Sequence, residues 1–156
     1  MKVKLICRDE AYKKAKVMFE ENGYQIDDEY DFLYLERDHQ QSKLVCQDYN
    51  GCKVICSIDE IKLIESDSYK NRVILKDGDV LLTNENLSYF ESEVFLMKLI
   101  RVNKSQIVGV SSIRKLSPQL NSRVKLTLND NTKIFVTRTY VKKFREMLHK
   151  KGELKW

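Results

Sequence analysis

The side chains best suited to chemistry lie in residues 99–113, LIRVNKSQIVGVSSI, and at Arg138 within VTRTYVKKF. They are mainly arginine, asparagine, lysine and serine. The arginine fork fits the edge of guanine, the asparagine amide matches adenine, and lysine brings positive charge to guanine or to a phosphate. These residue types predict a surface that faces nucleic acid.

Positive charge is concentrated in the last third of the chain. Residues 1–100 contain 14 Lys and Arg against 20 Asp and Glu, whereas residues 101–156 contain 14 against 3. The overall charge of +5 therefore combines a net −6 with a net +11. Such a basic region attracts polyanions at long range. Lysines and arginines that only solvate strands and a final helix would give the same count, so both explanations stay open.

Catalytic and nucleotide-binding motifs are missing from the sequence. None of the five glycines belongs to a G-x-G-x-x-G or G-x4-G-K motif, and the two histidines lie in polar contexts. The acidic run 27–29 is typical of a solvated turn. We therefore expect no enzyme and no cofactor.

The four cysteines are expected to be free thiols. Cys46, Cys52 and Cys56 have C-x5-C and C-x3-C spacings, unlike the C-x2-C pairs of zinc sites. Cys52 and Cys56 alternate with Val54 on one side of a predicted strand, so packing explains them without a metal. No metal site is expected.

The first 42 residues predict a small α+β unit. The pattern gives a strand over 2–7, a helix over 10–22 with Asp9 as its N-cap, and a strand over 32–36. The predicted apolar stripe of the helix consists of Ala11, Tyr12, Ala15, Met18 and Phe19. Polar residues 37–43 predict a linker. The unit is similar to the first third of a receiver domain, but the strand that carries a receiver's phosphoacceptor aspartate is missing, so we expect no phosphorylation.

The remaining residues predict an antiparallel, mainly β domain with two short helices. Hairpin turns are predicted at Asn50-Gly51, Asp77-Gly78 and Asn129-Asp130-Asn131. One helix is predicted over 86–94, after an Asn84 cap. A second is predicted over 140–150, after a Thr139 cap.

From about residue 43 to its end, the chain resembles the LytTR family of bacterial DNA-binding domains. The resemblance is carried by IKLIES (61–66), NRVILKDGDVLLT (71–83), NLSYFESEV (86–94), LIRVNKSQIVGVSSIRKL (99–116) and VKLTLNDNTKIFVTRTYVKKF (124–144). The fourth segment corresponds to the family's Arg-x-His-Arg-Ser-Tyr-x-Val-Asn segment. The resemblance implies a β scaffold whose loops enter the major groove of DNA.

Carried across position by position, the resemblance implies nine DNA-contacting residues. Base contacts are implied for Asn71, Arg72, Lys104 and Arg138. Phosphate contacts or supporting roles are implied for Arg101, Asn103, Ser105, Lys142 and Lys143. The chain departs from the family's usual residues at Asn103, Lys104, Gln106 and Gly109. Structural roles would also account for some of the nine, because Arg101 can pair with Glu65 or Glu93 and Asn71 can simply begin a hairpin.

The sequence thus predicts an appendage over residues 1–42 and a LytTR-like domain over residues 43–156. The expected function is sequence-specific binding of promoter duplex DNA by a bacterial transcription regulator. A homodimer on repeated sites and a regulatory membrane protein are further expected partners. No apolar run is long enough to span a membrane and the N-terminus is too charged for a signal peptide, so we expect a cytoplasmic protein. A protein-interaction module with an acidic partner, and RNA binding, are the alternatives.

Overall fold

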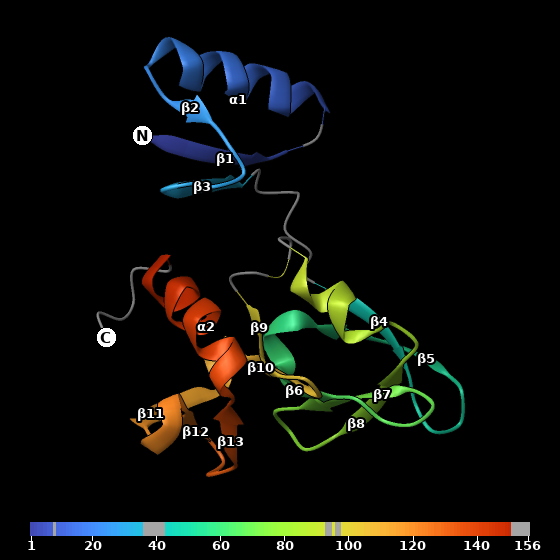
Figure 1. Cartoon of the computed structure of the whole chain (residues 1–156). Coiled ribbons are helices and arrows are strands. Elements are labelled where there is room, and N and C mark those ends of the chain that lie inside the picture. The colour runs from blue at the N-terminus through green and yellow to red at the C-terminus, as the bar shows by residue number, and fades with distance from the viewer. Residues whose placement is uncertain (8, 36–42, 93–94, 96–97, 151–156) are drawn as a thin grey trace. The chain divides into compact units, whose positions relative to one another are not determined.

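The chain divides into two compact units, Met1–Gln41 and Ser42–Trp156. The computed structural model (Figure 1) describes residues 1–7, 9–35, 43–92, 95 and 98–150. The predicted linker over 37–43 lies outside the described residues except for Lys43, which begins a strand. No described helix is long and apolar enough to cross a membrane.

The first unit is a parallel sheet with one helix. Its strands are β1 (Lys2–Ile6), β2 (Gln25–Ile26) and β3 (Phe32–Leu35), in the order β2-β1-β3, and its helix is α1 (Asp9–Glu21). The two-residue strand β2 was not predicted, because it is too short to show a periodic pattern.

The helix α1 packs with Ala15 buried against Val3 and Leu5, and with Phe19 partly buried beside them. The expectation for Met18 was wrong, because its side chain is 47% exposed. A helix that covers a sheet of two short strands and one longer one can bury only a narrow stripe.

The second unit is built on an antiparallel sheet in the order β5-β4-β8-β7-β6-β10-β9. Its strands are β4 (Lys43–Gln47), β5 (Lys53–Ser57), β6 (Ile61–Glu65), β7 (Asn71–Leu75), β8 (Val80–Thr83), β9 (Leu99–Asn103) and β10 (Gln106–Gly109). Gly51 and Gly78 have φ of 82° and 95° in the β4–β5 and β7–β8 turns. These angles strongly favour glycine, and both predicted hairpins are confirmed.

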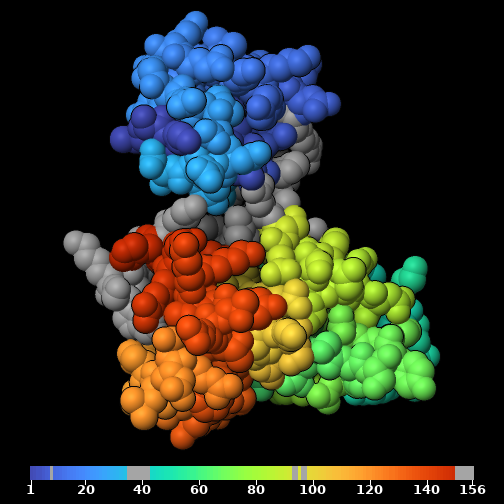
Figure 2. Space-filling view, in the orientation of Figure 1, coloured from blue at the N-terminus to red at the C-terminus, as the bar shows by residue number. Residues whose placement is uncertain are grey.

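A second antiparallel sheet, β11-β12-β13, and the helix α2 complete this unit. Their bounds are β11 (Ile113–Pro118), β12 (Val124–Leu128), β13 (Lys133–Val136) and α2 (Arg138–Lys150). The third predicted hairpin joins β12 to β13, with Asn131 at φ 68°. Figure 2 shows α2 (red) next to this sheet (orange) and to β9–β10 (yellow), consistent with the contacts of α2 with β9 and β13. The mainly β fold is confirmed.

One apolar cluster holds the second sheet, α2 and the β6-β10-β9 side of the first sheet together. Phe144 and Leu148 of α2 pack in it with Val102, Leu126 and other buried residues of both sheets. Lys142, Lys143 and Arg145 on α2 are exposed, as expected for an amphipathic helix. The position of α2 is therefore fixed by its apolar face, and its basic face remains in solvent.

The structure corrects both predicted helix caps. Asn86, and not Asn84, accepts the Tyr89 N–H at 2.9 Å and begins a short 3-10 helix over Leu87–Glu91. The end of the predicted helix 86–94 lies outside the described residues. The helix α2 begins at Arg138 rather than after Thr139, because the chain already turns at Thr137, whose C=O accepts the Tyr140 N–H.

The cysteines are free, and they differ in burial. Cys46 and Cys56 are buried, but Cys52 is exposed and precedes β5, so packing does not explain it and that part of the prediction was wrong. A hydrogen bond with Cys56 and burial raise the pKa of the Cys46 thiol. Within the described residues, no three His, Cys, Asp or Glu side chains form a metal-binding group.

An ion pair joins the two sheets of the second unit. Lys62 Nζ on β6 lies 2.7 Å from Asp130 Oδ2 in the β12–β13 turn, and Asp130 Oδ1 accepts the Thr132 N–H. These contacts hold the pKa of the Asp130 carboxyl below its usual value. Since the carboxylate is partly exposed, the pair stabilises the fold by about 1 kcal/mol or less.

Replacing Asp130 with Asn is expected to lower the free energy of unfolding by that amount near neutral pH. Because the pKa is depressed in the folded state, this stability is present above the unfolded-state pKa of about 4 and is lost progressively as pH falls towards the lower folded-state pKa. Urea unfolding of both proteins at about pH 7 and about pH 2.5 measures the effect. Glu146→Gln, at an exposed position on α2, is the control and should change little. An Asp130→Asn deficit of equal size at both pH values would contradict the prediction.

Candidate nucleic-acid interface

The candidate residues gather along one edge of the second unit. On this edge, Glu65 of β6 is the register partner of both Arg72 of β7 and Gln106 of β10. The N–H of Ser66 also donates to the C=O of Ser105 at 2.8 Å. The β6–β7 connection, residues 66–70, therefore lies beside the β9–β10 turn that contains Lys104.

The junction between β13 and α2 belongs to the same edge. The Thr137 N–H donates to the Val102 C=O at 3.0 Å, and Asn103 Nδ2 donates to the Phe135 C=O at 3.2 Å. Arg138 follows directly in the chain. We call the β6–β7 connection, the β9–β10 turn and the β13–α2 junction together the interface edge.

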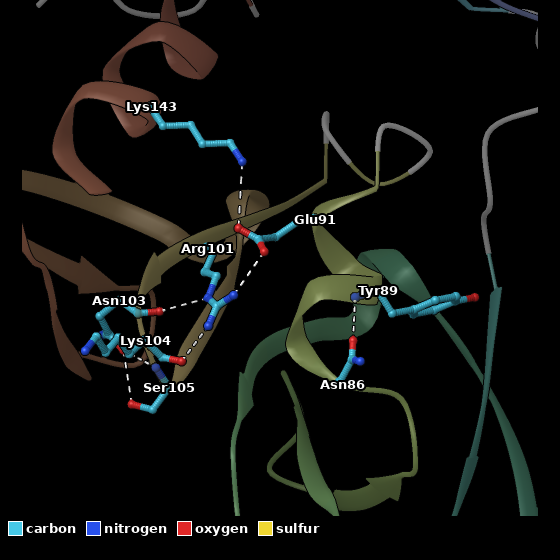
Figure 3. Close-up of polar contacts among 8 residues, drawn as sticks. All are labelled: Asn86, Tyr89, Glu91, Arg101, Asn103, Lys104, Ser105 and Lys143. Atoms are coloured by element: carbon cyan, nitrogen blue, oxygen red, sulfur yellow. Dashed lines mark hydrogen bonds and ion pairs between the residues drawn. The ribbon is translucent and has the colours of Figure 1, made fainter. Parts of the chain in front are cut away.

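Arg101 supports the β9–β10 turn from inside (Figure 3). Its Nη2 donates to the Lys104 C=O at 2.7 Å, its Nε to the Asn103 C=O at 3.2 Å, and its Nη1 lies 3.0 Å from Glu91 Oε2. The guanidinium also lies over the Tyr140 ring, 5.6 Å from its centroid. With a side chain only 18% exposed, Arg101 is placed to hold the turn rather than to reach a phosphate.

Asn103 and Ser105 complete the support of the turn. Asn103 Oδ1 accepts both the Ser105 N–H at 3.0 Å and the Ser105 hydroxyl at 3.1 Å. Its Nδ2 donates to Gln106 Oε1 and to the Phe135 C=O. Because these polar atoms are engaged within the protein, Asn103 fixes the turn and leaves Lys104 at its tip.

Within the described part of the chain, three cations on the interface edge and on α2 are exposed and unpaired. They are Lys104, Arg138 and Lys142. Among the described residues, none makes a side-chain hydrogen bond or an ion pair with any of them. Lys143 differs, because its Nζ lies 3.7 Å from Glu91 Oε1, the carboxylate that also binds Arg101. The exposed cations give this part of the edge a positive charge that is available to a ligand.

At the opposite end of the edge, the polar side chains already bind other groups of the protein. Arg72 Nη2 lies 2.6 Å from Glu65 Oε2, and Arg72 Nε is buried with no hydrogen-bond partner among the described residues. Asn71 Nδ2 donates to the Glu85 C=O at 2.8 Å. A base could be contacted here only by a partial exchange of these interactions.

Sequence reasoning missed the residues that organise the edge. Glu91 binds Arg101, where Glu65 or Glu93 had been considered, and Gln106 Nε2 donates to Glu65 Oε1 at 2.9 Å. The strand register brings Gln106 beside Glu65, and the packing of the 3-10 helix Leu87–Glu91 brings Glu91 to Arg101, so neither pairing shows in the sequence alone. The position of Glu65 at the end of an apolar strand was the one visible signal.

An antiparallel β scaffold whose strand-end turns present exposed lysine and arginine offers a positively charged surface suited to a polyanion such as duplex DNA. The comparisons agree. The chain belongs to the LytTR family, because residues 52–149 match the model of the LytTr DNA-binding domain. This match confirms the resemblance seen in the sequence, and the matched domain is a DNA-binding domain.

Two relatives and one solved structure are similar to parts of this chain. The sensory transduction protein LytT of Bacillus subtilis is 32% identical, over 47% of this chain and 34% of its own length. LytR of Staphylococcus saprophyticus is 26% identical, over 42% of this chain and 26% of its own. The chain therefore matches only about a third or less of these relatives. A LytTr DNA-binding domain of a Bacillus cereus response regulator has the same fold, with a TM-score of 0.61, 21% identity, and coverage of 69% of this chain and 97% of that one.

Proposed function

We propose that residues 43–156 bind promoter duplex DNA in a sequence-specific manner and that the protein is a cytoplasmic bacterial transcription regulator. The observation that carries this proposal is the rigid β9–β10 turn, which Arg101 and Asn103 hold from inside while Lys104 points into solvent. Base reading requires a side chain on such a fixed support.

The nine candidate residues divide into three roles under this proposal. Lys104 and Arg138 contact bases, because both are exposed and unpaired among the described residues. Lys142 and Lys143 contact phosphates from the exposed face of α2. Arg101, Asn103 and Ser105 support the turn. Asn71 and Arg72 contact bases after the exchange of their present partners, which are the Glu85 C=O for Asn71 and the carboxylates of Glu65 and Asp67 for Arg72.

Duplex DNA suits this surface better than the alternatives. Single-stranded RNA is typically read by several aromatic rings on an open sheet. The described strands of the second unit carry one aromatic residue, Phe135 on β13, and the exposed Tyr69 lies in the β6–β7 connection instead. An acidic protein partner would match the charge but would not require arginine and lysine at the ends of several strands. The α+β unit at residues 1–42 is assigned to regulation, through a membrane protein or through pairing of two copies on repeated sites.

Anisotropy titration of the full chain tests the proposal. The probes are labelled duplexes from a selection of random sequences, scrambled duplexes and single-stranded RNA, each at several salt concentrations. We expect tightest binding to the selected duplex, with affinity falling by a log–log slope of roughly −0.9 per phosphate contacted. Titration of residues 43–156 alone assigns the activity to that unit. No duplex binding at low salt, or tighter binding to RNA, would overturn the proposal.

A further inference from the structure

The turn between β11 and β12 lies at the same end of its sheet as Arg138. In the register, Pro118 of β11 pairs with Val124 of β12, which pairs in turn with Val136 of β13. Continuing this antiparallel register by one residue places Arg123 opposite Thr137, immediately before Arg138. Two arginines that are 15 positions apart in sequence thus stand on neighbouring strand ends.

The conformation of this turn is well defined. The N–H of Gln119 donates to the C=O of Arg123 at 2.9 Å, and Gln119 Nε2 donates to the C=O of Ser117 and of Pro118. Within the turn, Asn121 and Ser122 have φ of 63° and 58°. The turn residues Leu120–Ser122 also contact α2. These contacts hold the turn next to the helix that begins with Arg138.

The surroundings of Arg123 are basic. Its side chain is exposed, and no described residue pairs with it. Lys142 lies four residues after Arg138 in α2, so the two share one face of the helix. Arg123 and Arg138 thus bring two exposed cations to neighbouring strand ends, which extends the interface edge onto the second sheet.

We propose that Arg123 binds a phosphate of the duplex beside the base contact of Arg138, which makes the β11–β12 turn part of the DNA-binding surface. This inference rests on the proposed function. Arg123 lies at the end of the β11–β12 turn, directly before β12. Its guanidinium is not oriented by any hydrogen bond from the described residues. A phosphate contact needs positive charge but little fixed orientation, whereas a base contact needs both.

Replacing Arg123 with Ala in the full chain is expected to weaken binding about tenfold, equally on the selected and the scrambled duplex. The salt slope should fall by about 0.9, which is the effect of one phosphate contact. Arg123→Lys keeps the charge and should retain most of the affinity and slope. Anisotropy titration at several salt concentrations measures all of these, and circular dichroism checks that each variant is folded.

Arg114 provides a control with the same change of charge. It is also exposed and lies on the same sheet, but at the opposite end, next to the Ile113–Leu128 pair, and its Nη2 donates to Asn131 at 2.6 Å. Arg114→Ala should leave affinity within about twofold and the slope unchanged, because a remote charge is largely screened by salt.

The outcomes separate this inference from the proposed function. If the unmodified chain binds duplex DNA and Arg123→Ala behaves like Arg114→Ala, the Arg123 contact is wrong and the proposed function stands. If Arg123→Ala weakens only the selected duplex, or if Arg123→Lys restores nothing, the assignment to phosphate is wrong. If the unmodified chain binds no duplex, the proposed function fails and the Arg123 contact fails with it.

Discussion

Replacing Arg138 with Ala is expected to weaken binding to the selected duplex by about 1 to 3 kcal/mol, the usual size of a bidentate base contact. Arg138 is the first residue of α2 and follows β13, and the N–H of the preceding Thr137 donates to the Val102 C=O. Its backbone is thus fixed on both sides, while its side chain is exposed. On scrambled duplex the loss should be much smaller. Anisotropy titration against both duplexes measures the difference.

Lys142→Ala is the matched control for Arg138→Ala. It removes one positive charge from the same face of α2, one helical turn away. As a phosphate contact, Lys142 should contribute equally to both duplexes, so its loss should weaken the two by the same factor. An equal loss on both duplexes from Arg138→Ala would mean that Arg138 acts only through its charge.

Gly109→Ala is expected to destabilise the second unit by about 3 kcal/mol, through a clash that relaxes only if strands separate. A Cβ at Gly109 on β10 would overlap the C=O oxygen of Ile61 on β6 and lie 3.1 Å from its carbonyl carbon. Both residues are buried, and the obstacle is backbone rather than a flexible side chain. Urea unfolding followed by circular dichroism measures the loss.

Gly51→Ala separates this clash from the general effect of replacing glycine. Gly51 has φ of +82°, and no heavy atom lies within 4 Å of the point that an added Cβ would occupy, so the substitution costs only backbone strain of about 1 to 2 kcal/mol. If Gly109→Ala destabilises the protein no more than Gly51→Ala does, the close approach of β6 and β10 is not maintained in solution. The LytTR segment that this chain resembles has Asn at the position of Gly109. An Asn side chain here would require β6 and β10 to move apart.

The sequence was sufficient for features that depend on neighbouring residues. Asn50-Gly51 and Asp77-Gly78 predicted their hairpins because the turn needs a left-handed residue at that point. The burial of Phe144 has the same local origin, because this residue lies on the apolar face of α2. The separation of the strands into two sheets depends on pairings between distant segments, which no local pattern contains.

The candidate site was predictable to a similar extent. The residue types near Lys104 and Arg138 indicated a basic surface, and family resemblance supplied the positions. Whether a given cation is free or engaged followed only from the structure, because Glu91, which binds Arg101, belongs to a different element. The same limit hid Arg123, whose place beside Thr137 depends on the register of β12 with β13.

The pairing of Arg72 with Glu65 gives the two ends of the interface edge different energetic roles. Under the proposed function, DNA at the Lys104 and Arg138 end would meet cations that no described residue neutralises, so each contact would add directly to affinity. At the Arg72 end, a base must compete with a carboxylate 2.6 Å away. Under the proposed function, a mismatched base that fails to replace this partner would gain nothing, so the Arg72 contact would add to the discrimination that Arg138 provides and little to the strength of binding.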